Sequence, residues 1–457
     1  MKIVIVGGGS VLWTPRLGCD LLLEKSLNGS ELVLTDIDHE AACLCAAYLR
    51  LANRQLNSRW RIRVAGPDAA LKGADAVLVS ISTGGFEAMA QDYNIPEKYG
   101  VFHTVGDTTG PGGISRTLRN VPVFLNLARR MNRLCPEAWM IHVTNPLTQL
   151  TRAVERSGLI RIVGMCHEYT GAMGTLAKFF GVESRDIDSL CVGVNHFTVL
   201  KDLTVRGIRA PEKQLTVANY IAFERARKGI QLSGTVDDIV AEGTASSEEL
   251  LPCYLNFAVA EKWGFFPLAG ASHVCESLPG INVSPEMLAR WHVYRKGVLP
   301  DRPRAKAERR DKLLAVLKER SAVPEAETRS REMAADAMVA LLTGEPRRII
   351  AACANRGQID DLPRNATVET WTLASRCGIN PVASGKLPSA AKGFMEQIVS
   401  EEELAVEAAL TGDFDALVQA LVVSPLLTDK RLAPALAREL VGANAQYLPQ
   451  FKNIPTA

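Results

Sequence analysis

The stretch Lys2-Ile3-Val4-Ile5-Val6-Gly7-Gly8-Gly9-Ser10 decides the fold prediction, because a β-branched strand runs directly into three glycines. A helical pattern of leucines follows, and the next apolar strand ends at Asp36 and Asp38. Glycines at such a turn let the backbone approach a pyrophosphate at a helix N-terminus, and an acid after the second strand accepts hydrogen bonds from ribose hydroxyls. The opening predicts a dinucleotide-binding βαβ unit whose cofactor contacts are Gly7, Gly9, Ser10, Asp36 and Asp38.

The dinucleotide motif is incomplete, since Leu12 stands where the third glycine of G-x-G-x-x-G would be. Taken alone, the glycine run could also be an ordinary tight turn between a strand and a helix. Asp36 adds weight to the dinucleotide reading and favours NAD over a cofactor with a 2′-phosphate.

Further strands are predicted with helical patterns between them, at Ala76–Ile81, Trp139–Thr144, Ile160–Met165 and Ser189–Val194. This alternation favours a parallel, doubly wound sheet, which binds ligands at the carboxyl ends of its strands. The segment from Val105 to Ile114 is rich in glycine, so we expect an exposed loop beside the cofactor.

The alternation fades near residue 200, and helical patterns dominate the rest of the 457-residue chain. We therefore predict an α/β fold with two domains: residues 1–198 form a Rossmann-like, NAD-binding domain, and residues 199–457 form a mainly helical α+β domain for substrate binding and oligomerisation. The highly charged run from Arg302 to Arg331 is predicted as a solvated helix or a lid.

The net charge of +2 gives no electrostatic signature for nucleic acid or an anionic membrane, so a small molecule is the expected partner. The N-terminus has no signal-peptide pattern and no apolar run is long enough to span a bilayer, which predicts a soluble, cytoplasmic protein. Ten cysteines without a framework spacing favour reduced thiols. One of these thiols can then be a metal ligand.

Two strand ends carry the residues of a metal site. Gly164-Met165-Cys166-His167-Glu168 and Gly193-Val194-Asn195-His196-Phe197 each follow or end an apolar run. A thiolate and an imidazole can hold a divalent ion while leaving positions open for substrate oxygens. The alternative is a buried cysteine and a core histidine bonded to the backbone.

These motifs, with the glycine turn, Gly84-Gly85, Thr144-Asn145-Pro146 and Asn355-Arg356-Gly357-Gln358, resemble glycoside hydrolase family 4 over nearly the whole chain. That family consists of glycosidases that depend on NAD and a divalent metal. The resemblance implies a first domain like that of lactate and malate dehydrogenases, Mn²⁺ as the metal, and a homodimer or homotetramer. It also implies a reaction in which NAD⁺ takes hydride from sugar C3, a base removes the C2 proton, the C1 aglycone is eliminated, water adds and the hydride returns.

The resemblance assigns Cys166 and His196 as metal ligands. His167 stands where some members carry the acid for the leaving group, although it could instead orient the metal site, and a histidine has a suitable pKa for acid catalysis. Tyr254, in Pro252-Cys253-Tyr254-Leu255, matches the family's base for the C2 proton, with an ordinary core tyrosine as the alternative.

Asp107 falls where the family places an acidic residue near the substrate, and we count it as catalytic. Asn145 matches the asparagine that contacts the sugar, and it also lies at the predicted cofactor edge. Asp107 and Asn145 could each instead cap a turn. The remaining candidates for substrate binding are Asn195, Arg116, Glu168 and His273. The alternatives are pairing with acids for Arg116, a salt bridge for Glu168 and a polar surface position for His273.

One departure bears on the substrate, because Met89 stands near the place of an arginine found in the phospho-glucosidase branches. This favours a non-phosphorylated α-glycoside: a glucoside, a galactoside or a hexuronide. An acidic sugar would need its own cation, for which Arg116 is the candidate. The alternative functions are an NAD-dependent dehydrogenase of a sugar or hydroxy acid that releases NADH, and a nucleotide-binding protein without catalysis.

Overall fold

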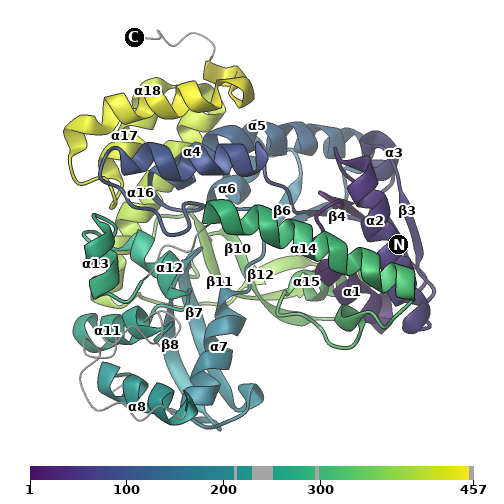
Figure 1. Cartoon of the computed structure of the whole chain (residues 1–457), viewed down its shortest axis with the longest axis horizontal. Helices are drawn as coiled ribbons and strands as arrows, with labels where there is room; N and C mark the ends of the chain where they lie inside the picture. The colour runs from purple at the N-terminus through teal and green to yellow at the C-terminus, as the bar shows by residue number, and fades with distance from the viewer. Residues whose placement is uncertain (210–213, 229–250, 294–297, 452–457) are drawn as a thin grey trace.

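The computed structural model describes residues 1–209, 214–228, 251–293 and 298–451 (Figure 1). Its strands are β1 Lys2–Val6, β2 Glu31–Thr35, β3 Arg61–Val64, β4 Ala76–Val79, β5 Trp139–His142, β6 Arg161–Gly164, β7 Ile187–Val194, β8 Phe197–Val205, β9 Ile208–Arg209, β10 Arg347–Ala354, β11 Thr367–Ser375 and β12 Gly378–Pro381. Its α-helices are α1 Thr14–Leu23, α2 His39–Gln55, α3 Pro67–Leu71, α4 Gly85–Glu97, α5 Gly110–Leu134, α6 Leu147–Ser157, α7 Glu168–Phe179, α8 Val217–Lys228, α11 Tyr254–Trp263, α12 Ala271–Val274, α13 Pro285–Arg290, α14 Val298–Glu319, α15 Ala334–Thr343, α16 Ser389–Thr411, α17 Phe414–Val423 and α18 Ala433–Asn444. No helix within these ranges is long and apolar enough to cross a membrane.

One twelve-stranded sheet organises the molecule, in the order β3-β2-β1-β4-β5-β6-β10-β11-β7-β8-β9, with β12 beside β11. The first six strands in this order are parallel, and helices connect them along the chain. This half confirms the predicted Rossmann-like, doubly wound sheet. The other strands pair antiparallel, and most of the helical second half of the chain surrounds them (Figure 1).

The predicted strand Ser189–Val194 exists as part of β7, but its assignment to the parallel sheet is wrong. β7 pairs antiparallel with β8 and β11, and β10 and β11 separate it from β6. Only Asn195 and His196 lie between β7 and β8, and two residues can join antiparallel strands, whereas a parallel pair needs a crossover of about a dozen or more. The predicted boundary at 198/199 falls inside β8, and the division into domains 1–198 and 199–457 stays a prediction.

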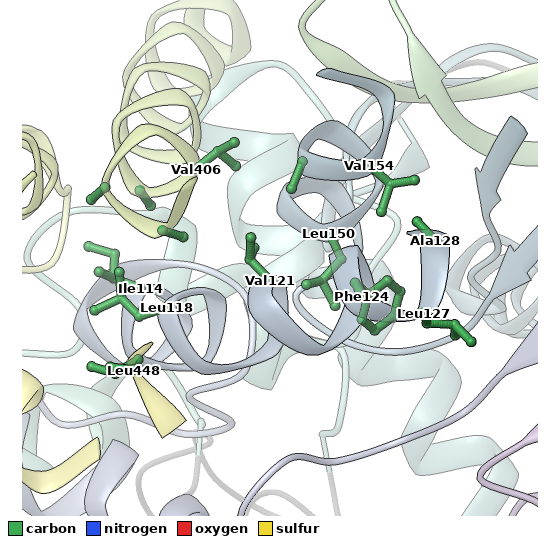
Figure 2. Packing of buried hydrophobic residues seen from close by; sticks show 14 of the residues in the cluster. Ile114, Leu118, Val121, Phe124, Leu127, Ala128, Leu150, Val154, Val406 and Leu448 are labelled. Carbon is green, nitrogen blue, oxygen red and sulfur yellow. The ribbon is translucent and has the colours of Figure 1, made fainter. Parts of the chain in front are cut away.

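Helices cover both faces of the parallel strands, because successive side chains of a strand point to opposite faces. Val4 and Val77 belong to the cluster on one face, with α5, α6 and α16, whereas Ile3 and Leu78 belong to the cluster with α1, α2 and α15. Figure 2 shows how the long helix α5 packs its apolar side against α6 and α16. The labelled residues at this contact are Ile114, Leu118, Val121, Phe124, Leu127, Ala128, Leu150, Val154 and Val406.

The glycine-rich segment 105–114 is not the exposed loop that was predicted. Helix α5 already begins at Gly110, and residues 106–115 are buried. A Cβ atom on Gly113 would lie 2.0 Å from the carbonyl oxygen of Thr108, a distance that no side chain can occupy. Glycine here serves close packing of a buried turn against the first turn of a helix, so the composition was misread as a sign of exposure.

Candidate active site

The glycine turn after β1 has the geometry of a dinucleotide cradle. Gly7 has φ +86°, and a Cβ on it would lie 2.0 Å from the carbonyl oxygen of Ser80. The Gly9 amide donates to Asp36 Oδ2 at 2.8 Å, which ties the turn to the end of β2. Asp38 accepts from the Ala41 amide and caps the N-terminus of α2. The narrow turn and the acid at the end of β2 therefore fit NAD, and Gly7, Gly9, Ser10, Asp36 and Asp38 stay its predicted contacts.

A hairpin tip positions His196. Val194 pairs with Phe197 across the tip, and His196 has φ +63°, in the left-handed region that non-glycine residues seldom adopt. Its side chain is nevertheless buried. Backbone strain of this kind is concentrated at functional sites, where the surrounding structure fixes an unfavourable conformation.

His196 belongs to a group of three side chains that could hold a metal ion. The ligand atoms of Asp107, His196 and His273 all lie within 4.8 Å of one another. The rings of His196 and His273 have centroids 3.7 Å apart, and Asp107 Oδ1 lies 3.6 Å from His196 Nδ1 and 4.0 Å from His273 Nδ1. A carboxylate with two imidazoles suits a divalent transition metal such as manganese or zinc.

The hydroxyl of Thr108 orients two members of this group. It donates to Asp107 Oδ1 at 2.9 Å and lies 2.8 Å from His196 Nδ1. A hydroxyl has one proton, so His196 Nδ1–H donates to Thr108 in this arrangement, and Nε2 keeps its lone pair for a metal. Asn145 donates to the other carboxylate oxygen of Asp107 at 2.9 Å.

The charges of the group suit metal binding near neutral pH. Burial, with help from His273, lowers the pKa of His196 to about 4, which keeps its imidazole neutral. Burial alone would raise the pKa of Asp107, but His196, His273 and Arg116 outweigh it and hold the pKa below its usual value. A neutral imidazole and an ionised carboxylate are the forms that bind metal.

Cys166 lies in a neighbouring cluster and is outside the group of three described above. Across the sheet, Gly164 of β6 pairs with Ala352 of β10, Ala352 pairs with Glu369 of β11, and Glu369 pairs with Gly193 of β7. Cys166 comes two residues after Gly164, and Asn195 comes two residues after Gly193. Asn195 donates to Glu369 Oε2 at 2.8 Å. Burial, followed by the charges of Glu369 and Glu168, raises the pKa of the Cys166 thiol well above its usual value. A nearby cation would favour the thiolate instead.

Glu168 links the two clusters. Burial would raise its pKa, but His273 and His196 outweigh burial and lower it. Its Oε2 accepts from the Gly270 amide at 2.7 Å, which fastens the start of α7 to the segment before α12. The predicted residues Cys166, His196, Glu168 and His273 are thus brought together.

His167 is held by an acid that the sequence did not point to. Its Nδ1 lies 3.0 Å from Oε1 of the buried Glu332, and this hydrogen bond raises the pKa of His167 above its usual value. Trp13, which follows the glycine turn, lies beside the imidazole with ring centroids 6.3 Å apart. His167 is therefore half exposed, between Trp13 after the cofactor turn and the buried Glu332.

Two arginines one turn apart on α5 have opposite surroundings. Arg119 makes two hydrogen bonds to Asp92, with Nη1 2.7 Å from Oδ1, and its Nε donates to the carbonyl of Thr83. Arg116 is 6% exposed, its Nε is buried without a hydrogen-bond partner, and no ion pair joins it to any residue in the described ranges. Burial lowers the pKa of Arg116. The guanidinium of Arg116 is thus available to an anionic group.

The buried Glu276 shapes the segment that carries Asp107. Its Oε1 accepts from the amides of Thr104, Val105 and Gly106 and lies 3.0 Å from His103 Nδ1. These bonds, with His103, outweigh burial and lower the pKa of Glu276. His273 and Glu276 are three residues apart in the sequence but have different roles. His273 belongs to the metal group, whereas Glu276 binds the backbone amides of residues 104–106.

Tyr254 is the first residue of α11, and its ring meets that of His292 edge-on with centroids 4.2 Å apart. Its proposed role as the base stays a prediction.

The residues that the sequence reasoning missed are Thr108, Glu332 and Glu369. Only Glu369 had a visible signal, since it is a lone acid within the apolar strand Val368-Glu369-Thr370-Trp371.

Comparisons with known proteins match nearly the whole length of the chain. A model of the family 4 glycosyl hydrolases matches residues 2–182, and a model of the C-terminal domain of the same hydrolases matches residues 191–427. An α-galacturonidase of Thermoanaerobacter italicus is 31% identical over 467 residues, which cover 98% of this chain and 97% of that protein.

An α-galactosidase of Rhizobium meliloti is 29% identical over 462 residues, which cover 98% of this chain and 89% of that protein. Among solved structures, LplD of Bacillus subtilis is similar with a TM-score of 0.82 at 30% identity, over 96% of this chain and 99% of that chain. The similarity thus includes both the parallel half of the sheet and the antiparallel half.

Proposed function

The chain belongs to family 4 of the glycosyl hydrolases, as its motifs predicted, and on this premise we propose that it hydrolyses a non-phosphorylated α-glycoside with NAD and Mn²⁺. The observation that carries the proposal is the group Asp107, His196 and His273, whose ligand atoms lie within 4.8 Å of one another. A two-carboxylate glycosidase has no need of such a group, nor of a glycine turn tied to an acid at the end of β2.

When bound, NAD would accept and return a hydride at the sugar, and the metal ion would polarise sugar oxygens as a Lewis acid. His196, Asp107 and His273 would hold the ion, and Cys166 is the candidate fourth donor. Asn145 would keep Asp107 in place through the 2.9 Å hydrogen bond to Oδ2. These residues fit the ion because they combine an anionic oxygen with neutral imidazoles.

His167 is the proposed acid for the leaving group. Its hydrogen bond to Glu332 raises its pKa, which favours the protonated ring that would give a proton to the departing oxygen. Tyr254 is kept as the proposed base for the C2 proton. Its ring meets that of His292 edge-on, with ring centroids 4.2 Å apart.

We further propose that the sugar is an α-hexuronide, with an α-galacturonide as the first choice. The support comes from Arg116, whose buried guanidinium has no acid bound to it, and from the α-galacturonidase similar to this chain. A guanidinium binds a carboxylate with two parallel hydrogen bonds, a geometry that a neutral hydroxymethyl group cannot reproduce.

The test is a panel of aryl α-galacturonide, α-galactoside and α-glucoside, assayed with NAD⁺, Mn²⁺ and a thiol reductant. We expect release of the aryl group from the galacturonide only when both cofactors are present, with no net growth of absorbance at 340 nm. Stoichiometric growth at 340 nm would indicate a dehydrogenase instead. Release that persists after both cofactors are removed would refute the proposed function.

A further inference from the structure

Helix α14 crosses the part of the molecule where the proposed function places the dinucleotide. It contacts α4 near one end and α2 near the other, and Figure 1 shows it running across the front of the molecule between them. α4 follows β4 and α2 follows β2, while β1 lies between these two strands in the sheet. A helix that runs from α4 to α2 therefore passes the carboxyl end of β1, where the glycine turn lies.

The two ends of α14 are fixed differently from its middle. At the α4 end, Arg302 is half-buried and lies close enough to Arg116 to add to the lowering of its pKa that burial causes. At the α2 end, Arg309 forms an ion pair with Glu325, and Leu313 is fully buried in the cluster that contains α1 and α2. Between these supports, residues 303–308 are all exposed.

The exposed middle includes the face of the helix that points inward. At about 100° per residue, positions 302, 306, 309 and 313 form one stripe, of which Arg302, Arg309 and Leu313 are wholly or partly buried. Lys306 lies on the same stripe but is exposed, and no ion pair joins it to any residue of the described chain. The helix is thus exposed between its two supports, and the ammonium of Lys306 lies on the same side of the helix as Arg302, Arg309 and Leu313.

We propose that α14 is a cationic bar across the dinucleotide site and that Lys306 binds the pyrophosphate of NAD. The chemistry fits, because the glycine turn supplies backbone amides from one side and the bar supplies a positive charge from the other. The charge is not matched locally, since Arg304 on the outer face takes Asp301 and Glu308 as its partners. The inference rests on the proposed function in so far as both require NAD to bind.

The experiment measures binding of NAD⁺ and of ADP-ribose by calorimetry, without substrate or added metal, at low and high salt. The variant is Lys306→Glu, and the matched control is Arg304→Glu, which makes the same change of charge on the outer face two residues away. Thermal unfolding of both variants checks that the fold is intact.

We expect Lys306→Glu to weaken both ligands roughly three- to tenfold at low salt, with a smaller effect at high salt, while Arg304→Glu stays within about twofold of the wild type. Both ligands carry the pyrophosphate, so an effect on NAD⁺ alone would overturn the assignment of Lys306. Unchanged binding by Lys306→Glu would also overturn it and leave the proposed function standing. Failure of the wild type to bind NAD⁺ would refute both.

Discussion

Replacing Arg116 by methionine should lower activity on hexuronides and leave the fold at least as stable as before. The buried guanidinium has an Nε without a partner, and leaving such a donor unsatisfied costs about 1–3 kcal/mol. The methionine variant avoids this cost, but it also loses the favourable attraction between Arg116 and Asp107. We therefore expect the free energy of unfolding to rise by about 1 kcal/mol or to stay unchanged.

The main effect of Arg116→Met should instead be a lower kcat/KM for hexuronide substrates. Truncating one partner of a buried, hydrogen-bonded charge pair costs about 2–5 kcal/mol. Since 1.36 kcal/mol corresponds to a factor of ten in rate, Arg116→Met should lower kcat/KM for an aryl α-galacturonide about 30-fold or more. Activity on the aryl α-galactoside, which has no carboxylate, should change less than about fivefold.

Arg119→Met, one turn along α5, is the matched control. Arg119 is paired with Asp92, which is completely buried, so this change leaves an uncompensated carboxylate and should lower the free energy of unfolding by about 3–5 kcal/mol. Urea unfolding and steady-state kinetics on both substrates measure these effects. The reasoning is refuted if Arg116→Met destabilises the protein as much as Arg119→Met, or if it reduces activity on both substrates equally.

Three further predictions follow from single contacts. Burial raises the pKa of Glu401 to about 7 from the usual 4.5, so the folded protein holds this proton more tightly than the unfolded chain. The free energy of unfolding should therefore fall by up to about 3 kcal/mol as the pH rises from 4.5 to 7. Glu401→Gln should reduce this pH dependence in urea unfolding, and an unchanged pH dependence would contradict the prediction. His273→Asn should weaken Mn²⁺ binding at least about tenfold by calorimetry, and wild-type affinity would place the ion elsewhere. Gly113→Ala should lower the free energy of unfolding by at least about 2 kcal/mol and weaken Mn²⁺ binding, because the added Cβ would displace Thr108. The control Gly393→Ala, on the open side of α16, should raise the free energy of unfolding by about 0.5–1 kcal/mol. Equal melting temperatures of the two variants would show that Thr108 moves aside freely.

The sequence was most informative where a pattern of residues directly determines local structure. The β-branched run before Gly7 and the acid at Asp36 predicted the turn that the structure contains, because both requirements act within one βαβ unit. The position of β7 could not be predicted in the same way. Its neighbour in the sheet is β11, which lies far away in the sequence, and nothing in the residues of β7 encodes that pairing.

In the candidate site, too, local sequence patterns predicted individual residues, but not how distant residues come together. Strand ends predicted Cys166, Asn195 and His196, and His273 was a candidate for substrate binding. That the ring of His273 lies against the ring of His196, and that both share a group with Asp107, depends on the position of α12 beside the hairpin, which only the tertiary structure reveals. Gly110, Gly112 and Gly113 were misread for a related reason, since composition does not distinguish an exposed turn from a tightly packed one.

The central claim is that the glycosidic bond is cleaved by elimination after oxidation of the sugar, with removal of the C2 proton. The most direct test is hydrolysis of the aryl α-glycoside in D₂O with NAD⁺ and Mn²⁺, followed by NMR of the sugar product. The account predicts deuterium at C2, because a proton taken by a base is replaced from solvent. Hydrolysis that leaves C2 unlabelled, as direct displacement with two carboxylates would, contradicts it.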